Sequence, residues 1–185
     1  MPRAGLSPGA VTDVAVAVVD EQGAEALTLA AVAGRAGVAT PSLYKHVGSL
    51  AHLRSLVGVR VLEELTAVLT SAAVGRSDDD AVAAVMRAFR AYVIAHPARY
   101  AALHPDPLHD PVLQPAGQKM IDVFVAMLRG YGLTASDAIH AIRRARVIVH
   151  GFATIEAVGG FGLAEDTDET YEQLIAMYLR SLPRP

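Results

Sequence analysis

Residues Thr28–Val47 read T-L-A-A-V-A-G-R-A-G-V-A-T-P-S-L-Y-K-H-V, and this stretch decides the fold. Thr28 is a favourable N-cap, because its hydroxyl can accept a backbone N–H of the first helical turn. Strong helix formers follow as far as Arg35. Gly37 can then adopt the left-handed conformation that ends a helix. The first half of the stretch therefore predicts a short helix that stops at a sharp turn.

The second half predicts another helix, from Pro41 to about His46, with Thr40 as N-cap and proline at the first helical position. A helix of about two turns is not stable alone, so its partner must hold it. Leu43 supplies an inward-facing apolar position. The other side chains are polar: Thr40, Ser42, Tyr44, Lys45 and His46. Such a helix presents polar groups outward, which is the arrangement of a helix-turn-helix whose second helix enters the DNA major groove.

A preceding helix completes a three-helix head over residues 1–48. Ser7 and Pro8 form its N-cap and first turn, and Gln22-Gly23 ends it. Apolar residues recur on one face at helical spacing: Val11, Val14, Ala15 and Val18. Core packing behind the helix-turn-helix is the simplest interpretation of this face.

The remainder, residues 49–185, is expected to form a larger helical bundle. Helices are predicted at residues 50–74, 78–96, 98–103, 118–130, 134–158 and from 167 or 168 onward. Residues 104–117 contain four prolines, so regular structure is not expected there. No strand-like alternation stands out. The fold class is therefore all-α, with about nine helices.

Two motifs resemble a known family. A-T-P-S-L-Y-K-H-V followed by G-S-L-A-H-L, residues 39–53, is similar to the recognition helix and following helix entry of TetR-family transcriptional regulators. V-H-G-F-A-T-I-E-A-V-G-G-F, residues 149–161, resembles the C-terminal ligand domain of the branch named for a W-H-G signature. Val149 stands here at the tryptophan position.

The resemblance implies a DNA-binding regulator, by family habit a repressor, that binds a palindromic operator as a homodimer. It places Thr40, Pro41, Ser42 and Tyr44 against base edges or thymine methyls. It places Thr28, Tyr44, Lys45 and His46 against phosphates. The candidate dimer interface is residues 138–158 with 170–182, which are rich in apolar side chains. Burial of these segments inside one subunit is the alternative.

A small-molecule effector is expected in the bundle. Its candidate pocket collects Met and Phe side chains from several helices together with a few polar tips. The residues are Met86, Phe89, Tyr92, Tyr100, Leu103, Met120, Phe124, Met127, Val147, His150 and Phe152. The alternative is that these residues are ordinary core. The pocket composition favours a mainly apolar or aromatic ligand that releases the DNA.

The charge and composition of the chain limit where DNA could bind and indicate its compartment. The 185 residues have a net charge of −3, so a phosphate-binding surface must be local, built from Arg3, Lys45, His46 and helix N-termini. Residues 1–60 carry five basic and four acidic groups, and residues 61–185 carry eleven and fifteen. There are no cysteines, no apolar run long enough for a membrane span and no signal-peptide core near Met1, which predicts a cytoplasmic protein.

The sequence contains no motif that indicates a catalytic site. The sequence contains no Glu-x-x-His pair for a di-iron bundle, no G-x-S-x-G elbow and no phosphate-cradling glycine loop. We therefore expect no enzyme, no metal site and no cofactor. The alternative function is a helical ligand-binding or scaffolding protein without DNA binding.

Overall fold

The computed structural model describes residues 6–104 and 107–183, and within these ranges the regular structure is entirely helical. Arg3, predicted to lie near phosphates, is outside the described residues. The chain forms two compact units, one of residues 1–63 and 98–118, the other of residues 64–97 and 119–185. No helix in the described part combines the length and the apolar character needed to cross a bilayer.

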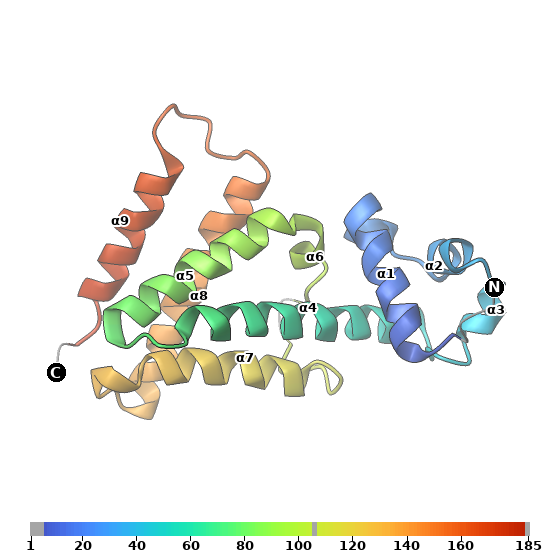
Figure 1. Cartoon of the computed structure of the whole chain (residues 1–185), viewed down its shortest axis with the longest axis horizontal. Helices are drawn as coiled ribbons and strands as arrows, with labels where there is room; N and C mark the ends of the chain where they lie inside the picture. The colour runs from blue at the N-terminus through green and yellow to red at the C-terminus, as the bar shows by residue number, and fades with distance from the viewer. Residues whose placement is uncertain (1–5, 105–106, 184–185) are drawn as a thin grey trace. The chain divides into compact units, whose positions relative to one another are not determined.

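The elements follow one another in an all-α order (Figure 1). They are α1 (Pro8–Gln22), the 3₁₀ turn η1 (Ala24–Ala26), α2 (Leu29–Ala36), α3 (Thr40–Leu43), α4 (Leu50–Ala73), α5 (Asp78–Ala95), α6 (Pro97–Ala101), α7 (Gln114–Met127), the 3₁₀ turn η2 (Arg129–Tyr131), α8 (Ala135–Ala157) and α9 (Thr167–Arg180). The prediction of an all-α chain with about nine helices is confirmed for the described residues.

In the first unit, α1, α2 and α3 pack together as a three-helix head (Figure 1). The Ser7 hydroxyl accepts the Ala10 N–H at 3.1 Å and starts α1, as its sequence predicts. The buried face of α1 is almost entirely apolar: Val11, Ala15, Val16, Val18 and Val19, with Thr12. This face contacts α2, which in turn contacts α3.

The turn between α2 and α3 depends on Gly37. Its φ of 67° and ψ of 32° are left-handed, and the Val38 N–H returns to the Ala33 carbonyl at 3.0 Å. The Thr28 hydroxyl accepts the Ala31 N–H at 3.1 Å and so caps the other end of α2. Both predicted ends of this helix are confirmed.

The predicted cap of the second helix is wrong by one residue. Ala39 is the N-cap of α3, Thr40 is its first helical residue, and Pro41 is its second. Proline is tolerated there because no intrahelical donor is needed in the first turn. The helix ends at Leu43, and a turn continues from it, in which the His46 N–H donates to the Leu43 carbonyl at 2.8 Å.

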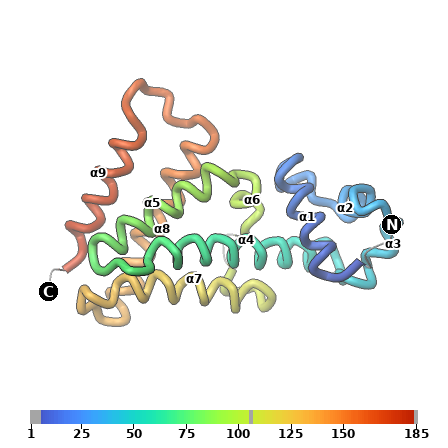
Figure 2. Tube along the Cα trace, viewed as in Figure 1, coloured from blue at the N-terminus to red at the C-terminus, as the bar shows by residue number. Residues whose placement is uncertain are grey.

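In the second unit, α5 contacts both α8 and α9, and α8 contacts α9 (Figure 2). Two buried tyrosines fix α9. Tyr171 donates to the Met86 carbonyl at 2.7 Å, and Tyr178 donates to the Ala141 carbonyl at 3.0 Å. Burial raises the pKa of Tyr178 to about 12, so the phenol stays protonated and remains a donor at neutral pH.

One helix boundary in the bundle was predicted four residues late. Helix α7 begins at Gln114, not at Gln118, because Pro115 falls in the first turn, where a missing N–H is harmless. The Gln114 N–H donates to the Asp110 carbonyl at 2.8 Å. The irregular segment is therefore shorter than the proline content of residues 104–117 suggested.

The left-handed Gly37 generates a stability prediction. Gly37→Ala should lower the free energy of unfolding by about 1–2 kcal/mol, because a Cβ is strained at this φ. Urea denaturation followed by circular dichroism measures the change.

Gly34→Ala is the matched control. Gly34 lies in the interior of α2 with no atom within 4 Å of an added Cβ, so this change should leave stability unaltered or raise it by up to about 1 kcal/mol. Equal destabilisation by both substitutions would show that conformation at Gly37 is not the cause.

Candidate nucleic-acid interface and ligand-domain sites

Helix α3 buries one side chain and leaves the others at least partly exposed. Leu43 is 0% exposed, and Val47 just beyond the helix is 1% exposed. Tyr44 is 56% exposed, and Pro41 and Lys45 are also exposed. The half-buried members of the predicted DNA set are Thr40, Ser42 and His46. The head thus holds a short helix by its apolar side and leaves hydroxyls, a phenol and an ammonium group in solvent.

Thr28, the remaining member of that set, can cap α2 and contact a phosphate at the same time. It is exposed, and its oxygen accepts the Ala31 N–H as the cap of α2. A hydroxyl that accepts one hydrogen bond can still donate its own proton. Thr28 can therefore donate to a phosphate oxygen without loosening the helix that it caps.

The cations of the first unit are mostly paired. Arg35 pairs with Glu21, Arg60 with Asp13 and Arg99 with Asp20. Lys45 and Arg54 are the lysines and arginines of this unit, within the described residues, that have no hydrogen-bonded or ionic partner. Since only Lys45 follows α3 directly, it is the cation best placed to meet a phosphate at the recognition helix.

All three of these ion pairs join α1 to another helix, and none was predicted from sequence. Asp20 accepts both Nε and a terminal nitrogen of Arg99 on α6 at 2.7 Å, a two-point contact that fixes orientation. Asp13 lies 2.6 Å from Arg60 on α4. The partners are far apart in sequence and no local pattern signals them.

The predicted ligand residues fall into three groups by exposure. Those in the core are Met86, Phe89, Tyr92, Phe124, Met127 and Phe152. Half-buried are Tyr100, Leu103 and Met120, whereas His150 and Val147 are exposed. Placing Val147 in an interior pocket is wrong for the single chain: it is 72% exposed, because it lies on the opposite side of α8 from the buried Ala145 and Val149.

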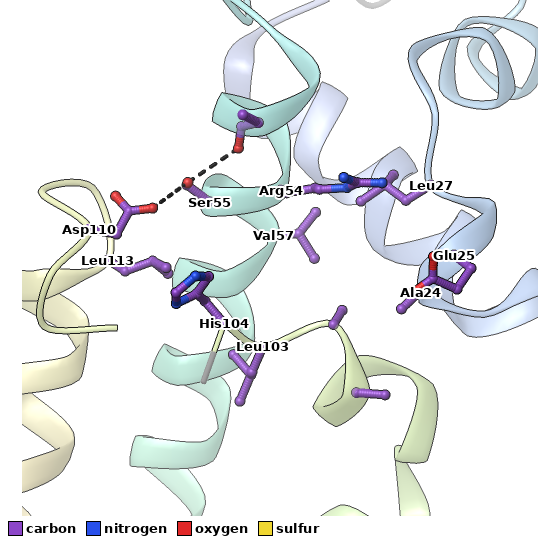
Figure 3. Close-up of a pocket in the computed structure, with 13 residues that line it drawn as sticks. Ala24, Glu25, Leu27, Arg54, Ser55, Val57, Leu103, His104, Asp110 and Leu113 are labelled. Atoms are coloured by element: carbon purple, nitrogen blue, oxygen red, sulfur yellow. Dashed lines mark hydrogen bonds between the residues drawn. The ribbon is translucent and has the colours of Figure 1, made fainter. Parts of the chain in front are cut away.

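Two of the predicted ligand residues border a cavity of the first or the second unit. Leu103 borders a cavity of about 420 Å³ in the first unit, between η1, α4, α6 and the segment leading to α7 (Figure 3). Phe152 borders a cavity of about 290 Å³ in the second unit, with Phe161 and Leu163 of the α8–α9 connection and Thr167 of α9. The other predicted residues pack as core or lie at the surface.

A charged cluster in the second unit shares Thr167 and Phe152 with this cavity. The Arg90 guanidinium on α5 donates from Nε to Glu156 on α8 at 2.6 Å and lies 2.7 Å from Asp168 on α9. Thr167 donates to the same Glu156 at 3.0 Å. The Arg90 Cζ also lies 5.3 Å from the Phe152 ring centre and 4.9 Å from that of Tyr171. One cation therefore joins three helices.

The hydrogen bond from Arg90, with that from Thr167, lowers the pKa of Glu156, although burial opposes the shift. The same hydrogen bond to Glu156 is the largest cause that raises the pKa of the Arg90 guanidinium. Within the described residues, no group of three or more histidine, aspartate or glutamate side chains is arranged to hold a metal ion.

The head and its exposed α3 define a helix-turn-helix transcriptional regulator as the class of protein. Comparisons agree with this assignment. Residues 11–53 match the bacterial regulatory proteins of the tetR family, and residues 82–178 match the tetracyclin repressor-like C-terminal domain. The chain therefore belongs to the TetR family of transcriptional regulators. Its place in the W-H-G branch stays a prediction.

Individual relatives span the whole chain. An uncharacterised HTH-type transcriptional regulator of Mycobacterium tuberculosis, Rv0681, is 33% identical over 98% of this chain and 84% of its own length. YobS of Bacillus subtilis, of the same description, is 29% identical over 98% and 95%. The crystal structure of BioQ with its double-stranded DNA operator aligns with a TM-score of 0.68 at 17% identity, over 95% of this chain and 99% of that one. This last likeness concerns the fold.

The Glu156 cluster generates a pH prediction. A carboxyl whose folded pKa is lowered adds stability above its unfolded pKa of about 4.3, and that stability is lost as the pH falls through the folded value. Glu156→Gln should therefore cost about 1–3 kcal/mol near pH 7, and the difference from the native chain should shrink below about pH 4.3. Urea denaturation at pH 7, 5 and 3.5 measures it.

Glu165→Gln is the control, because Glu165 is exposed in the α8–α9 connection and its side chain has no hydrogen-bonded or ionic partner among the described residues. It should change stability little at any of the three pH values. A penalty for Glu156→Gln that stays constant down to pH 3.5 would contradict the assigned role of the ionised carboxylate.

Proposed function

We propose that this regulator is a ligand-responsive repressor that binds a palindromic operator as a homodimer and is released by a small, mainly apolar or aromatic effector. The observation that carries the DNA-binding part is the burial pattern of α3, in which Leu43 anchors the helix and Tyr44 and Lys45 stay in solvent. Membership of a family of transcriptional regulators supports it.

Base readout falls to Thr40, Pro41, Ser42 and Tyr44. Their hydroxyls can bond base edges, and the threonine methyl and the proline ring can contact thymine methyls. Residues 40–46 contain no Arg, Asn or Gln, the side chains that bind guanine or adenine in a bidentate manner. Specificity then depends strongly on DNA shape and on bridging water.

Phosphate binding falls to Thr28, Tyr44, Lys45 and His46. Lys45→Ala should weaken binding to every duplex and reduce the slope of log affinity against log salt by about 0.9 per monomer, because one fewer counterion is released. Fluorescence anisotropy with the promoter fragment of the neighbouring genes, between about 50 and 200 mM salt, measures this.

The chain contains only one other lysine, Lys119, which is exposed in α7 and serves as the matched control. Lys119→Ala removes the same charge from the whole molecule, so it should leave the slope unchanged. Equal slopes for Lys45→Ala and the native chain would rule out the phosphate contact.

The dimer proposal rests on apolar side chains left exposed on α8, its C-terminal end and α9. These are Ile139, Val147, Ile155, Val158 and Met177. Exposed apolar surface on such a scale indicates an interaction site. The two buried tyrosines of α9 donate hydrogen bonds inside the chain, so burial in one subunit accounts for that side of the helix. The exposed Met177 of α9 is left for the proposed dimer contact.

Val147→Glu should shift sedimentation at micromolar concentration toward the monomer, because a buried unpaired carboxylate at an interface is costly. Val74→Glu is the control: Val74 is 70% exposed against 72% for Val147, and it lies outside the proposed interface. Identical sedimentation of the two variants would argue against α8 as the interface.

The effector is expected to act by binding one conformation of the dimer better than another. A coupling free energy of about 1–3 kcal/mol between effector and DNA sites would release the operator. The buried Met86, Phe89, Phe124, Met127 and Phe152 supply the apolar side chains that such a ligand would contact.

A further inference from the structure

The cavity of the first unit has a wall that is apolar and a rim that is charged (Figure 3). Its volume of about 420 Å³ falls within the range of about 300–1,000 Å³ for small-molecule sites. The apolar wall comes from four large side chains and several alanines of η1, α4, α6, the residues just after η1 and α6, and the residue just before α7. The large ones are Leu27, Val57, Leu103 and Leu113.

One carboxylate at this cavity is already used by the protein. Asp110 accepts the Ser55 hydroxyl at 2.6 Å and the Val112 N–H at 2.8 Å. The Ser55 bond is the first cause that lowers the pKa of Asp110, and the charge of His104 contributes. Asp110 therefore fixes the segment before α7 to α4 and is not available as the main ligand contact.

Two other charges at the cavity are unused. Glu25 on η1 and Arg54 on α4 are both exposed, and neither side chain has a hydrogen-bonded or ionic partner among the described residues. Figure 3 shows them on elements that border the same space. Charges of opposite sign thus border one cavity without satisfying each other.

We infer that this cavity binds a small zwitterion with an apolar body, of the dipeptide kind. Its carboxylate would meet Arg54, its ammonium group Glu25, and its side chains the wall of Leu27, Val57 and Leu103. A monoanion would pair with Arg54 but would be repelled by the Glu25 carboxylate. A monocation would pair with Glu25 but would be repelled by the Arg54 guanidinium. Only a ligand with both charges is favoured at each end.

This site is separate from the effector pocket of the proposed function. It lies in the first unit, beside η1 of the head, and ten of the eleven residues predicted for the effector are not among those that line it. The Asp20–Arg99 pair joins the same head to α6, whose last residue, Ala101, borders the cavity. Binding here needs no DNA and is measured independently of the repressor proposal.

Three matched probes test the inference on the full chain by titration calorimetry. They are leucyl-leucine, which is a zwitterion, N-acetyl-leucyl-leucine, which is a monoanion, and leucyl-leucine amide, which is a monocation. Leucyl-leucine should bind at least about tenfold more tightly than either blocked peptide, because each blocked form loses one charge-assisted contact. Equal affinities, preference for a blocked peptide, or no binding at millimolar concentration would overturn the inference.

Single substitutions assign the two charges. The Glu25→Gln variant has no carboxylate for the ammonium group, so it should bind N-acetyl-leucyl-leucine as tightly as leucyl-leucine. The Arg54→Gln variant has no guanidinium for the carboxylate, so it should bind leucyl-leucine amide as tightly as leucyl-leucine. The exposed Glu63 and Arg143 have no partner in the described residues and lie outside the cavity, so Glu63→Gln and Arg143→Gln are the controls. Selectivity that survives both Glu25→Gln and Arg54→Gln would overturn the assignment.

A steric variant locates the binding. Ala51 is exposed on the α4 wall of the cavity, so Ala51→Phe should fill part of it with little effect on folding and weaken leucyl-leucine by at least about tenfold. Undiminished binding to this variant would place the dipeptide elsewhere and overturn the inference.

Discussion

The structure of the head depends on the burial of Leu43. A helix as short as α3 has too few internal hydrogen bonds to offset the entropy of nucleation, so tertiary contacts must stabilise it. Leu43 is the buried side chain of α3, and Val47 adds a second apolar contact just after it. Because the apolar contacts are confined to one side, every other side chain of α3 is left at least partly in solvent. The same constraint that makes the helix stable therefore makes it a recognition surface.

Local signals predicted most of the fold, since they act within a few residues. The caps at Ser7 and Thr28 and the left-handed Gly37 all formed as their chemistry requires. The two errors in helix starts have one origin. The sequence pattern favours proline as the first residue of α3 and as a barrier before α7, whereas Pro41 and Pro115 lie inside their first turns. The first turn lacks intrahelical donors, so proline marks its vicinity and not its first residue.

The candidate sites were less predictable, because they join distant segments. The DNA residues follow from one continuous stretch and one cap, which a linear pattern can specify. The cavity at Glu25 and Arg54 draws on segments near residues 25, 54, 103 and 113, and no spacing rule connects these. Apolar periodicity likewise cannot distinguish a side chain that packs from one that lines a cavity, which is why most residues predicted for the effector lie in the core.

Charge explains why a dimer matters for the proposed function. In the first unit, arginines 35, 60 and 99 are paired with acidic groups, and the whole chain has a net charge of −3. A paired arginine contributes little field beyond the Debye length of about 8 Å at physiological salt. Under the proposed function, each head would bind phosphate mainly through Lys45, hydroxyls and helix N-termini, which gives weak binding for one half-site. In a dimer, binding of the second head would become intramolecular, so the dimer would bind the operator far more tightly than one head does. Since that gain vanishes when the separation of the heads no longer matches the groove spacing, a small change in separation would be enough to release the operator.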